Sequence, residues 1–254
     1  MTAQLSINLN KIALIRNSRE GDYPSVTEHA RLCVEAGAAG ITVHPRSDQR
    51  HIRASDVGEL AAMLSVEFNI EGNPFAGACR SERIDVGDYP GFMALIKQVK
   101  PAQCTLVPDS STQLTSDHGF DLRSQSQQLR PVVEACHAVG SRVSLFMDAD
   151  PEQIKLVKET GADRIELYTG PYALAFKENA EVDKAFRTFC DAANAALDCE
   201  LGVNAGHDLN LQNLPQFAQL PGLLEVSIGH AFTVDCIRMG LANAVAAYNK
   251  CLLG

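Results

Sequence analysis

The sequence predicts an α/β fold, a (β/α)8 TIM barrel whose active site lies at the C-terminal ends of its strands. Eight apolar stretches of strand length recur along the chain, helical segments separate them, and most end at a residue that can do chemistry. The chain has 254 residues, is 46% apolar, and contains no Pro/Gly/Ser linker. It can therefore bury one large core, and we expect a single barrel domain over residues 1–254.

The expected strands cover residues 5–9, 40–44, 67–71, 103–107, 142–147, 164–168, 200–204 and 223–228. Between them, apolar residues follow the i, i+3, i+4 spacing of amphipathic helices, as at Val26, Ala30 and Cys33. Residues 35–44 also resemble residues 159–168, because each segment is a helix end with a glycine suited to a left-handed turn, followed by a strand. These copies belong to strands two and six, half a barrel apart.

Two connections are longer than a barrel requires, and both are expected at the mouth. They are residues 72–90 after the third strand and residues 108–120 after the fourth. Loops of this length are often lids, and we expect residues 108–120 to act as one. For residues 72–90, a surface insertion explains the sequence as well as a lid does.

The charge balance limits the classes of partner. With 22 basic and 31 acidic residues, the net charge of −9 argues against general binding to nucleic acid or to an anionic membrane. The N-terminal segment lacks an apolar signal region, and no window approaches a membrane span, so we expect a cytoplasmic protein. The eight cysteines show neither a CxxC pair nor zinc-like spacing, which predicts reduced thiols that serve packing.

The densest cluster of chemical groups leaves the second strand. His44, Arg46, Arg50 and His51 place two imidazoles and two guanidiniums within eight residues. Imidazole titrates near neutrality and guanidinium binds phosphate through two hydrogen bonds, so the cluster combines proton transfer with anion recognition. A solvated basic loop is the alternative, but the place of His44 at a strand end favours function.

Two carboxylates are candidates for proton transfer. Glu71 closes an apolar strand, and a partly buried carboxylate at a barrel mouth can have a raised pKa and act as a general base. A buried ion pair with a neighbouring arginine is the alternative. The same alternative is stronger for Glu166, because Arg164 stands two residues before it. Asp109 and Asp148, at two further strand ends, are expected to have supporting or structural roles.

Phosphate binding is expected at two places. Glycine and histidine occur together in residues 202–208 and 227–231, after the seventh and eighth strands, where many barrels bind phosphate through backbone N–H groups. After the first strand, Lys11, Arg16 and Arg19 are expected to hold a second anion together with the basic loop 46–51. A substrate or substrate pair with two phosphates would account for both groups.

The stretches NLNKIALIRNSR, GITVHPRSDQRHI, FNIEGNP, SLFMDAD, NAGHDL and IGHA together resemble the pyridoxine 5′-phosphate synthase family. The resemblance covers nearly the whole chain. It implies a transferase that condenses 1-deoxy-D-xylulose 5-phosphate with 3-amino-2-oxopropyl phosphate, releasing phosphate and water while the vitamin B6 ring closes. It further implies no metal, no organic cofactor, and a homo-oligomer, commonly an octamer.

The resemblance also implies a role for each matching residue. His44 and Glu71 would be proton acceptors and His207 a proton donor, while Glu166 would assist proton transfer or the handling of released water. The amino-ketone phosphate would be bound by Asn8, Arg19, His207, Asp208, Gly229 and His230. The deoxyxylulose phosphate would be bound by Asn10, Lys11, Arg46, His51 and Thr115.

The chain departs from the family pattern at several positions. Asn10 and Lys11 stand where many members have Asp-His, so the deoxyxylulose contact would use an amide and an ammonium. Asp208 stands beside His207 where a glycine is usual, and Tyr168 replaces a usual histidine. The connection 72–90 is longer than in the shorter members.

Two other function classes remain open at this point. A divalent-metal isomerase or hydrolase could use inward-pointing ligands, although no HxxE or HxH spacing supports it; the candidates are His44, Glu71, Asp148, Glu166, His207 and His230. A barrel that binds a phosphorylated ligand without turnover is the other class. A Schiff-base role for Lys11 has little support, because nothing in the sequence indicates the depressed pKa it requires.

Overall fold

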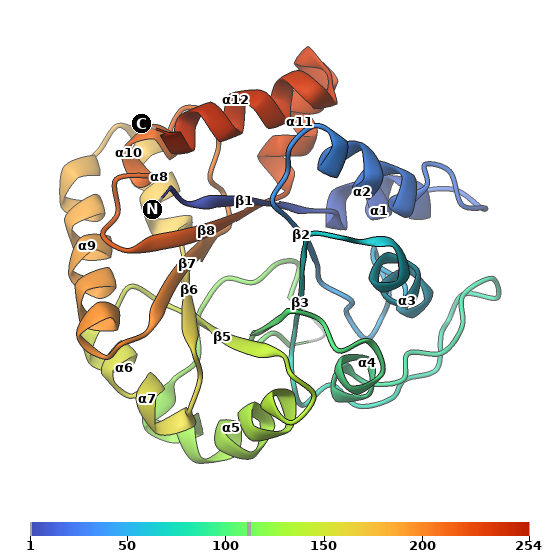
Figure 1. Ribbon diagram of the computed structural model, residues 1–254, viewed down its shortest axis with the longest axis horizontal. Coiled ribbons are helices and arrows are strands. Elements are labelled where there is room, and N and C mark those ends of the chain that lie inside the picture. The colour runs from blue at the N-terminus through green and yellow to red at the C-terminus, as the bar shows by residue number, and fades with distance from the viewer. Residues whose placement is uncertain (1, 111–112, 254) are drawn as a thin grey trace.

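The computed structural model describes residues 2–110 and 113–253. Its centre is a closed barrel of eight parallel strands, each paired with its neighbours in chain order (Figure 1). The strands are β1 (Gln4–Asn8), β2 (Gly40–Val43), β3 (Glu67–Gly72), β4 (Gln103–Leu106), β5 (Arg142–Met147), β6 (Arg164–Tyr168), β7 (Gly202–Gly206) and β8 (Leu223–Ile228). The predicted (β/α)8 barrel is therefore confirmed.

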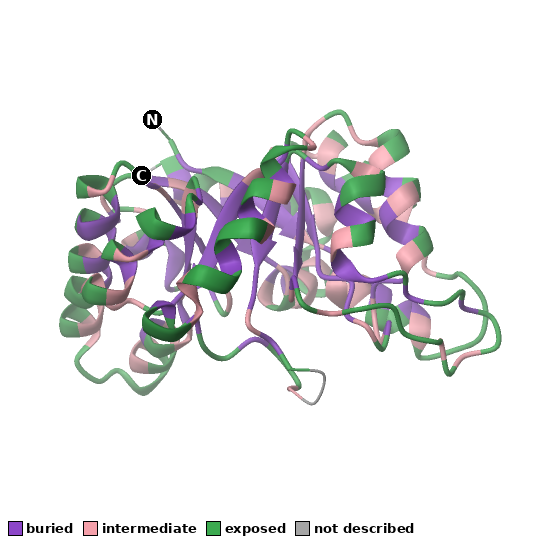
Figure 2. Ribbon diagram, turned by 90° about the horizontal axis from the view of Figure 1, so that it is seen from below, coloured by how far each residue is buried: buried purple, intermediate pink, exposed green. Residues whose placement is uncertain are grey.

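Helices surround the barrel and turn their buried faces towards it (Figures 1 and 2). They are α1 (Asn10–Asn17), α2 (Val26–Glu35), α3 (Ala54–Met63), α4 (Phe92–Val99), α5 (Leu122–His137), α6 (Pro151–Lys155), α7 (Val157–Thr160), α8 (Gly170–Glu178), α9 (Val182–Asp198), α10 (Leu214–Phe217), α11 (His230–Met239) and α12 (Leu241–Leu253). Helix α2 follows the predicted pattern, because Val26, Ala30 and Cys33 are buried, and the Ser25 hydroxyl caps it by accepting the Glu28 N–H.

The seventh strand begins two residues later than predicted. Helix α9 ends at Asp198, and the chain then turns through Glu200, whose φ of 60° is left-handed. The strand therefore starts at Gly202 and ends at Gly206, which places His207 directly after it. The two copies of the internal repeat behave as predicted, since Gly37 and Gly161 have φ values of 104° and 81°.

The barrel interior is polar, whereas TIM-barrel interiors are usually filled by bulky branched side chains. Thr105 on β4 donates to Glu166 on β6 at 3.2 Å, and Asn204 on β7 donates to Gln103 on β4 at 3.3 Å. These strands are not neighbours, so both hydrogen bonds cross the interior. The apolar core lies instead between the strands and the helices, where Ile7 and Ile41 are fully buried.

The connection between β3 and α4 forms an arm beside the barrel. Figure 1 shows it extending outward past α4, away from the barrel axis. Cys79 and Tyr89 exchange backbone hydrogen bonds of 2.9 and 2.8 Å across the arm, and Gln49 donates to the Gly87 carbonyl at 2.7 Å. This arrangement favours a surface insertion over a lid for residues 72–90.

The described structure has no membrane-spanning helix and no disulfide bond. Within the described ranges, no helix is both long and apolar enough to cross a membrane. All eight cysteines are free thiols, and Cys33, Cys104 and Cys136 are buried.

Candidate active site

The C-terminal ends of the strands bring a histidine and two carboxylates together. His44 follows β2, Glu71 lies near the end of β3, and Asp109 follows β4. The imidazole lies between the two acids, with Nδ1 3.9 Å from Glu71 Oε2 and Nε2 3.8 Å from Asp109 Oδ2. All three side chains are buried, so electrostatic interactions among them are little screened by water. The predicted convergence of His44 and Glu71 is what the structure shows.

The end of β1 orients this cluster. Asn8 Nδ2 donates to Glu71 Oε2 at 3.2 Å, and Asn8 Oδ1 accepts the Asn10 N–H at 2.9 Å. Asn10 Oδ1 in turn accepts the backbone N–H of His44 at 2.9 Å. The amide oxygen of Asn10 is thus used by the protein, which leaves its Nδ2 group as a donor for a ligand.

Burial raises the pKa of both inner carboxylates. The pKa of Glu71 lies well above its ordinary value because the group is desolvated, and the nearby charges of Glu166 and Asp109 raise it further. Burial raises the pKa of Glu166 to about 7, against a lowering contribution from the Thr105 hydroxyl. Glu166 can therefore accept and return a proton near neutral pH, and the raised pKa makes Glu71 a stronger base than an ordinary carboxylate.

The imidazoles of the basic loop are held neutral. Burial lowers the pKa of His44 well below its ordinary value, and Arg46 and His51 lower it further by charge repulsion. Burial also lowers the pKa of His51 to about 3, again with a contribution from Arg46. A neutral His44 has a free lone pair, which a proton acceptor requires.

His207 lies on the β7 side of the mouth in an unusual backbone conformation. Its φ is 84° and that of Asp208 is 50°, a left-handed pair without glycine, and such strain often occurs at functional sites. Its Nε2 lies 2.7 Å from Thr115 Oγ1, its Nδ1 lies 3.5 Å from Asp208 Oδ2, and the Tyr168 ring packs edge-on at 5.5 Å. The imidazole is therefore oriented from three directions.

The connection 108–120 lies across the mouth. Near its middle, Arg46 and Arg50 both donate to the Gln113 carbonyl, at 2.7 and 2.9 Å. Two residues further on, Thr115 contacts His207. These contacts join the β2 and β7 sides of the mouth, and a lid role for the connection stays a prediction; residues 111–112 lie outside the described part of the chain.

One predicted anion ligand is a structural residue instead. Arg16 is buried and paired with Asp56, with NH1–Oδ1 and NH2–Oδ2 distances of 2.5 and 2.9 Å. It also donates to the His51 carbonyl at 2.9 Å. The expectation that Arg16 holds a phosphate is therefore wrong, because its donors are occupied in fixing the basic loop.

The remaining predicted ligands belong to the segments that follow β1 and β8. Arg19 follows the C-terminus of α1 and is exposed, Lys11 is half-buried in the first turn of α1, and His230 is exposed at the start of α11. A Cβ at Gly229 would lie 3.1 Å from the Asn8 side chain, so these two predicted ligands of one phosphate lie close together. The backbone N–H groups at the start of α11 suit an anion at this point.

Asp109 was expected to have a supporting or structural role, and the structure places it in the cluster itself. It forms an ion pair with Arg46 and lies beside His44. Its place at the end of β4 was the signal that could have identified it, since His44 and Glu71 were found by the same rule.

The metal-dependent alternative lacks a ligand set in the described structure. Across residues 2–110 and 113–253, no three His, Cys, Asp or Glu side chains are arranged to hold a metal ion. The predicted candidates His230 and Asp148 are exposed at separate strand ends.

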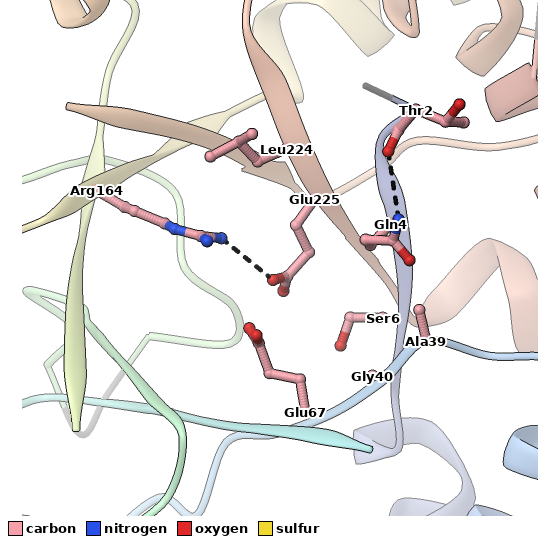
Figure 3. A pocket seen from close by; sticks show the side chains of 9 residues that line it. All are labelled: Thr2, Gln4, Ser6, Ala39, Gly40, Glu67, Arg164, Leu224 and Glu225. Carbon is pink, nitrogen blue, oxygen red and sulfur yellow. Dashed lines mark hydrogen bonds and ion pairs between the residues drawn. The ribbon is translucent and has the colours of Figure 1, made fainter. Parts of the chain in front are cut away.

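A cavity lies at the opposite, N-terminal end of the barrel. It has a volume of about 430 Å³, and the side chains of Glu67, Glu225 and Arg164 point into it (Figure 3). Arg164 lies 3.8 Å from Glu225, and Arg142 forms an ion pair with Glu67. Burial raises the pKa of Glu225 well above its ordinary value, and the charge of Glu67 raises it further.

Glu225 should therefore make stability depend on pH. The pKa of Glu225 is raised in the folded chain, so folding favours the protonated carboxyl group. The stability that this group contributes is fully present below the unfolded pKa and is lost as the pH rises towards the folded pKa. We expect the stability of Glu225→Gln, relative to the natural chain, to increase as the pH rises above the ordinary glutamate pKa of 4.5. Urea unfolding at several pH values measures this difference. For the exposed Glu159→Gln, the difference in unfolding free energy from the natural chain should not change with pH. If the difference for Glu225→Gln did not change with pH either, the raised pKa of Glu225 would be refuted.

Comparisons with known proteins agree with this geometry. The family model described as "Pyridoxal phosphate biosynthesis protein PdxJ" matches residues 5–253. A pyridoxine 5′-phosphate synthase of Xanthomonas axonopodis pv. citri (strain 306) is 53% identical over 252 residues, covering 98% of this chain and 96% of the relative. The synthase of Albidiferax ferrireducens is 49% identical over 258 residues, covering 99% and 98%.

Similarity to solved structures shows the fold. The tryptophan synthase A-subunit of Pyrococcus furiosus superimposes with a TM-score of 0.57 at 14% identity, covering 99% of this chain and 96% of that one. Thiamine phosphate pyrophosphorylase of the same organism gives 0.56 at 12% identity, covering 98% and 95%. By its full-length family match and its curated relatives, this chain belongs to the PdxJ family of pyridoxal phosphate biosynthesis proteins.

Proposed function

We infer that this chain is a pyridoxine 5′-phosphate synthase, a transferase of vitamin B6 biosynthesis. The observation that carries the inference is the buried imidazole of His44 between the carboxyl groups of Glu71 and Asp109, in a chain about half identical to named synthases. The substrates proposed for it are 1-deoxy-D-xylulose 5-phosphate and 3-amino-2-oxopropyl phosphate. Both carry a phosphate, and basic residues stand on two sides of the mouth.

We propose that the two substrates bind side by side over the barrel. The residues proposed for the amino-ketone phosphate are Asn8, Arg19, Asp208, Gly229 and His230. The residues proposed for the deoxyxylulose phosphate are Asn10, Lys11, Arg46, His51 and Thr115. The helix start at Gly229 and the guanidinium of Arg46 supply the strongest anion donors of the two groups.

Proton transfer is the chemistry that the site supports. The amine must condense with a ketone, phosphate and water must leave, and a carbon–carbon bond must close the ring. His44 is neutral and Glu71 has a raised pKa, which suits both as proton acceptors. We propose that His207 is the proton donor and that Glu166, whose pKa is about 7, relays a proton from inside the barrel.

The departures from the family pattern fit this scheme. Asn10 keeps only Nδ2 for the substrate, so it donates a hydrogen bond where an acid would accept one. Burial lowers the pKa of His207, and the carboxylate of Asp208, 3.5 Å from Nδ1, opposes that lowering, so it partly restores the protonated imidazole that a donor needs. The Asp208 carboxylate therefore acts on the imidazole, and we propose that the residue contacts the amino-ketone phosphate through its backbone.

We further propose a cytoplasmic homo-oligomer. Free thiols are typical of a reducing compartment. Helices α1 and α11 are in contact, and each exposes large apolar side chains: Leu14, Ile15, Ile237 and Met239. Surfaces of this kind are typical of subunit contacts. Light scattering of the purified chain gives the subunit number.

Growth of a bacterial strain that lacks its own synthase tests the function in a cell. We expect the chain to restore growth without added vitamin B6, and the Glu71→Gln chain to fail. In extracts and with purified protein, turnover should survive dialysis against EDTA. Turnover that is lost with EDTA and restored by one equivalent of a divalent metal would favour the isomerase or hydrolase alternative.

A further inference from the structure

Asp109 makes several contacts through one carboxylate oxygen. Its Oδ2 forms the ion pair with Arg46, accepts the Ser116 hydroxyl at 2.8 Å, and lies 3.8 Å from His44 Nε2. Its backbone carbonyl accepts Asn73 Nδ2 at 2.8 Å, which fixes the residue to the β3 side of the mouth. Its other oxygen, Oδ1, is buried without a hydrogen-bond donor among the described residues.

Burying Asp109 in this way costs folding free energy, and such a cost is often found at residues that serve function. A buried carboxylate oxygen without a donor loses the hydration that it has in water, and nothing on the protein replaces it. The favourable interactions of Asp109 therefore come through Oδ2, and the guanidinium of Arg46 is the strongest of them. The geometry thus couples Asp109 to Arg46.

The two acceptors on Arg46 differ in how firmly they are held. Asp109 is buried at the end of β4, whereas the Gln113 carbonyl belongs to the connection 108–120 and carries no charge. Arg50 donates to the same carbonyl. A dianionic phosphate would replace a neutral carbonyl more readily than a buried carboxylate. Arg46 would then keep its NH2 group on Asp109 and turn its NH1 group to the phosphate.

We propose that Asp109 is a positioning residue for the sugar-phosphate site, holding Arg46 in its phosphate-binding orientation and His44 with Nδ1 towards Glu71. The proposal rests on the proposed function. A carboxylate beside Nε2 favours the tautomer that is protonated there, which leaves the lone pair on Nδ1. One side chain would thus fix the anion ligand and the proton acceptor together.

Calorimetric binding of 1-deoxy-D-xylulose 5-phosphate tests the proposal without requiring turnover. Asp109→Asn removes the charge at nearly constant size, and we expect its Kd to rise roughly ten- to hundredfold, the range for a charged hydrogen bond. Asp109→Glu should recover part of the affinity. The matched control is Asp85→Asn, which removes an exposed carboxylate paired with Arg83 outside the mouth, and its Kd should equal that of the natural chain.

Steady-state kinetics add a readout that a merely structural residue would not give. In Asp109→Asn, KM for the sugar phosphate should rise while KM for the amino-ketone phosphate changes less than about twofold. In the Arg46→Lys background, Asp109→Asn should raise KM for the sugar phosphate little further, because Asp109 acts through Arg46. An unchanged Kd, or an equal rise in both KM values, would overturn the proposal. A natural chain that binds the sugar phosphate but makes no product would overturn the proposed function alone.

Discussion

Glu71→Gln is expected to lower kcat by about 10²-fold or more, the usual scale for removing a general base. Glutamine keeps the shape of the side chain and still offers an oxygen to Asn8 Nδ2, so the β1 contact survives. It cannot take up a proton, however. Binding of each phosphorylated substrate should therefore stay within a few-fold of the natural chain, as measured by calorimetry beside steady-state kinetics.

The matched control is Glu225→Gln, which changes another buried carboxyl group with a raised pKa at the opposite end of the barrel. It should leave kcat nearly unchanged. If Glu71→Gln lost binding and turnover equally, Glu71 would be a structural residue. The contacts of Glu71 already argue against the ion-pair alternative, since they are made by Asn8 and His44.

The largest stability effect is expected for Asp56→Asn. The change leaves the buried guanidinium of Arg16 without its counter-charge, which costs roughly 3–5 kcal/mol of unfolding free energy in comparable cases. Asp56 Oδ2 also accepts the Arg53 N–H at 2.7 Å at the start of α3. Urea unfolding measures the loss.

The exposed pair of Arg31 and Glu35 provides the comparison. Breaking it with Glu35→Gln should cost far less unfolding free energy than Asp56→Asn, because water screens both charges. Equal costs for the two variants would contradict the structural role given to Arg16. Since Arg16 also holds the His51 carbonyl, we expect Asp56→Asn to raise KM for the sugar phosphate as well.

The fold could be predicted because the barrel repeats one pattern. Apolar strands alternate with amphipathic helices, and Gly37 and Gly161 mark the same turn in two copies. The start of β7 was missed because the sequence does not reveal that Glu200 turns through a left-handed conformation after α9. Helix ends of this kind depend on local backbone geometry more than on residue type.

The site was predictable only where strand position decides it. His44 and Glu71 stand at strand ends, so the topology brings them together. Arg16 and Arg19 lie three residues apart, and the sequence does not say which one reaches a buried partner such as Asp56. The contacts of Asp109 were not predictable for a related reason, because they come from Arg46 and Ser116, which tertiary structure places beside it.

The most direct test of the central claim is an assay of the purified chain with both phosphorylated substrates. We predict that pyridoxine 5′-phosphate and inorganic phosphate appear in equal amounts, with no added metal or cofactor, and that neither substrate alone yields either product. Binding of both substrates without product, or turnover that requires a divalent metal, would contradict the assignment.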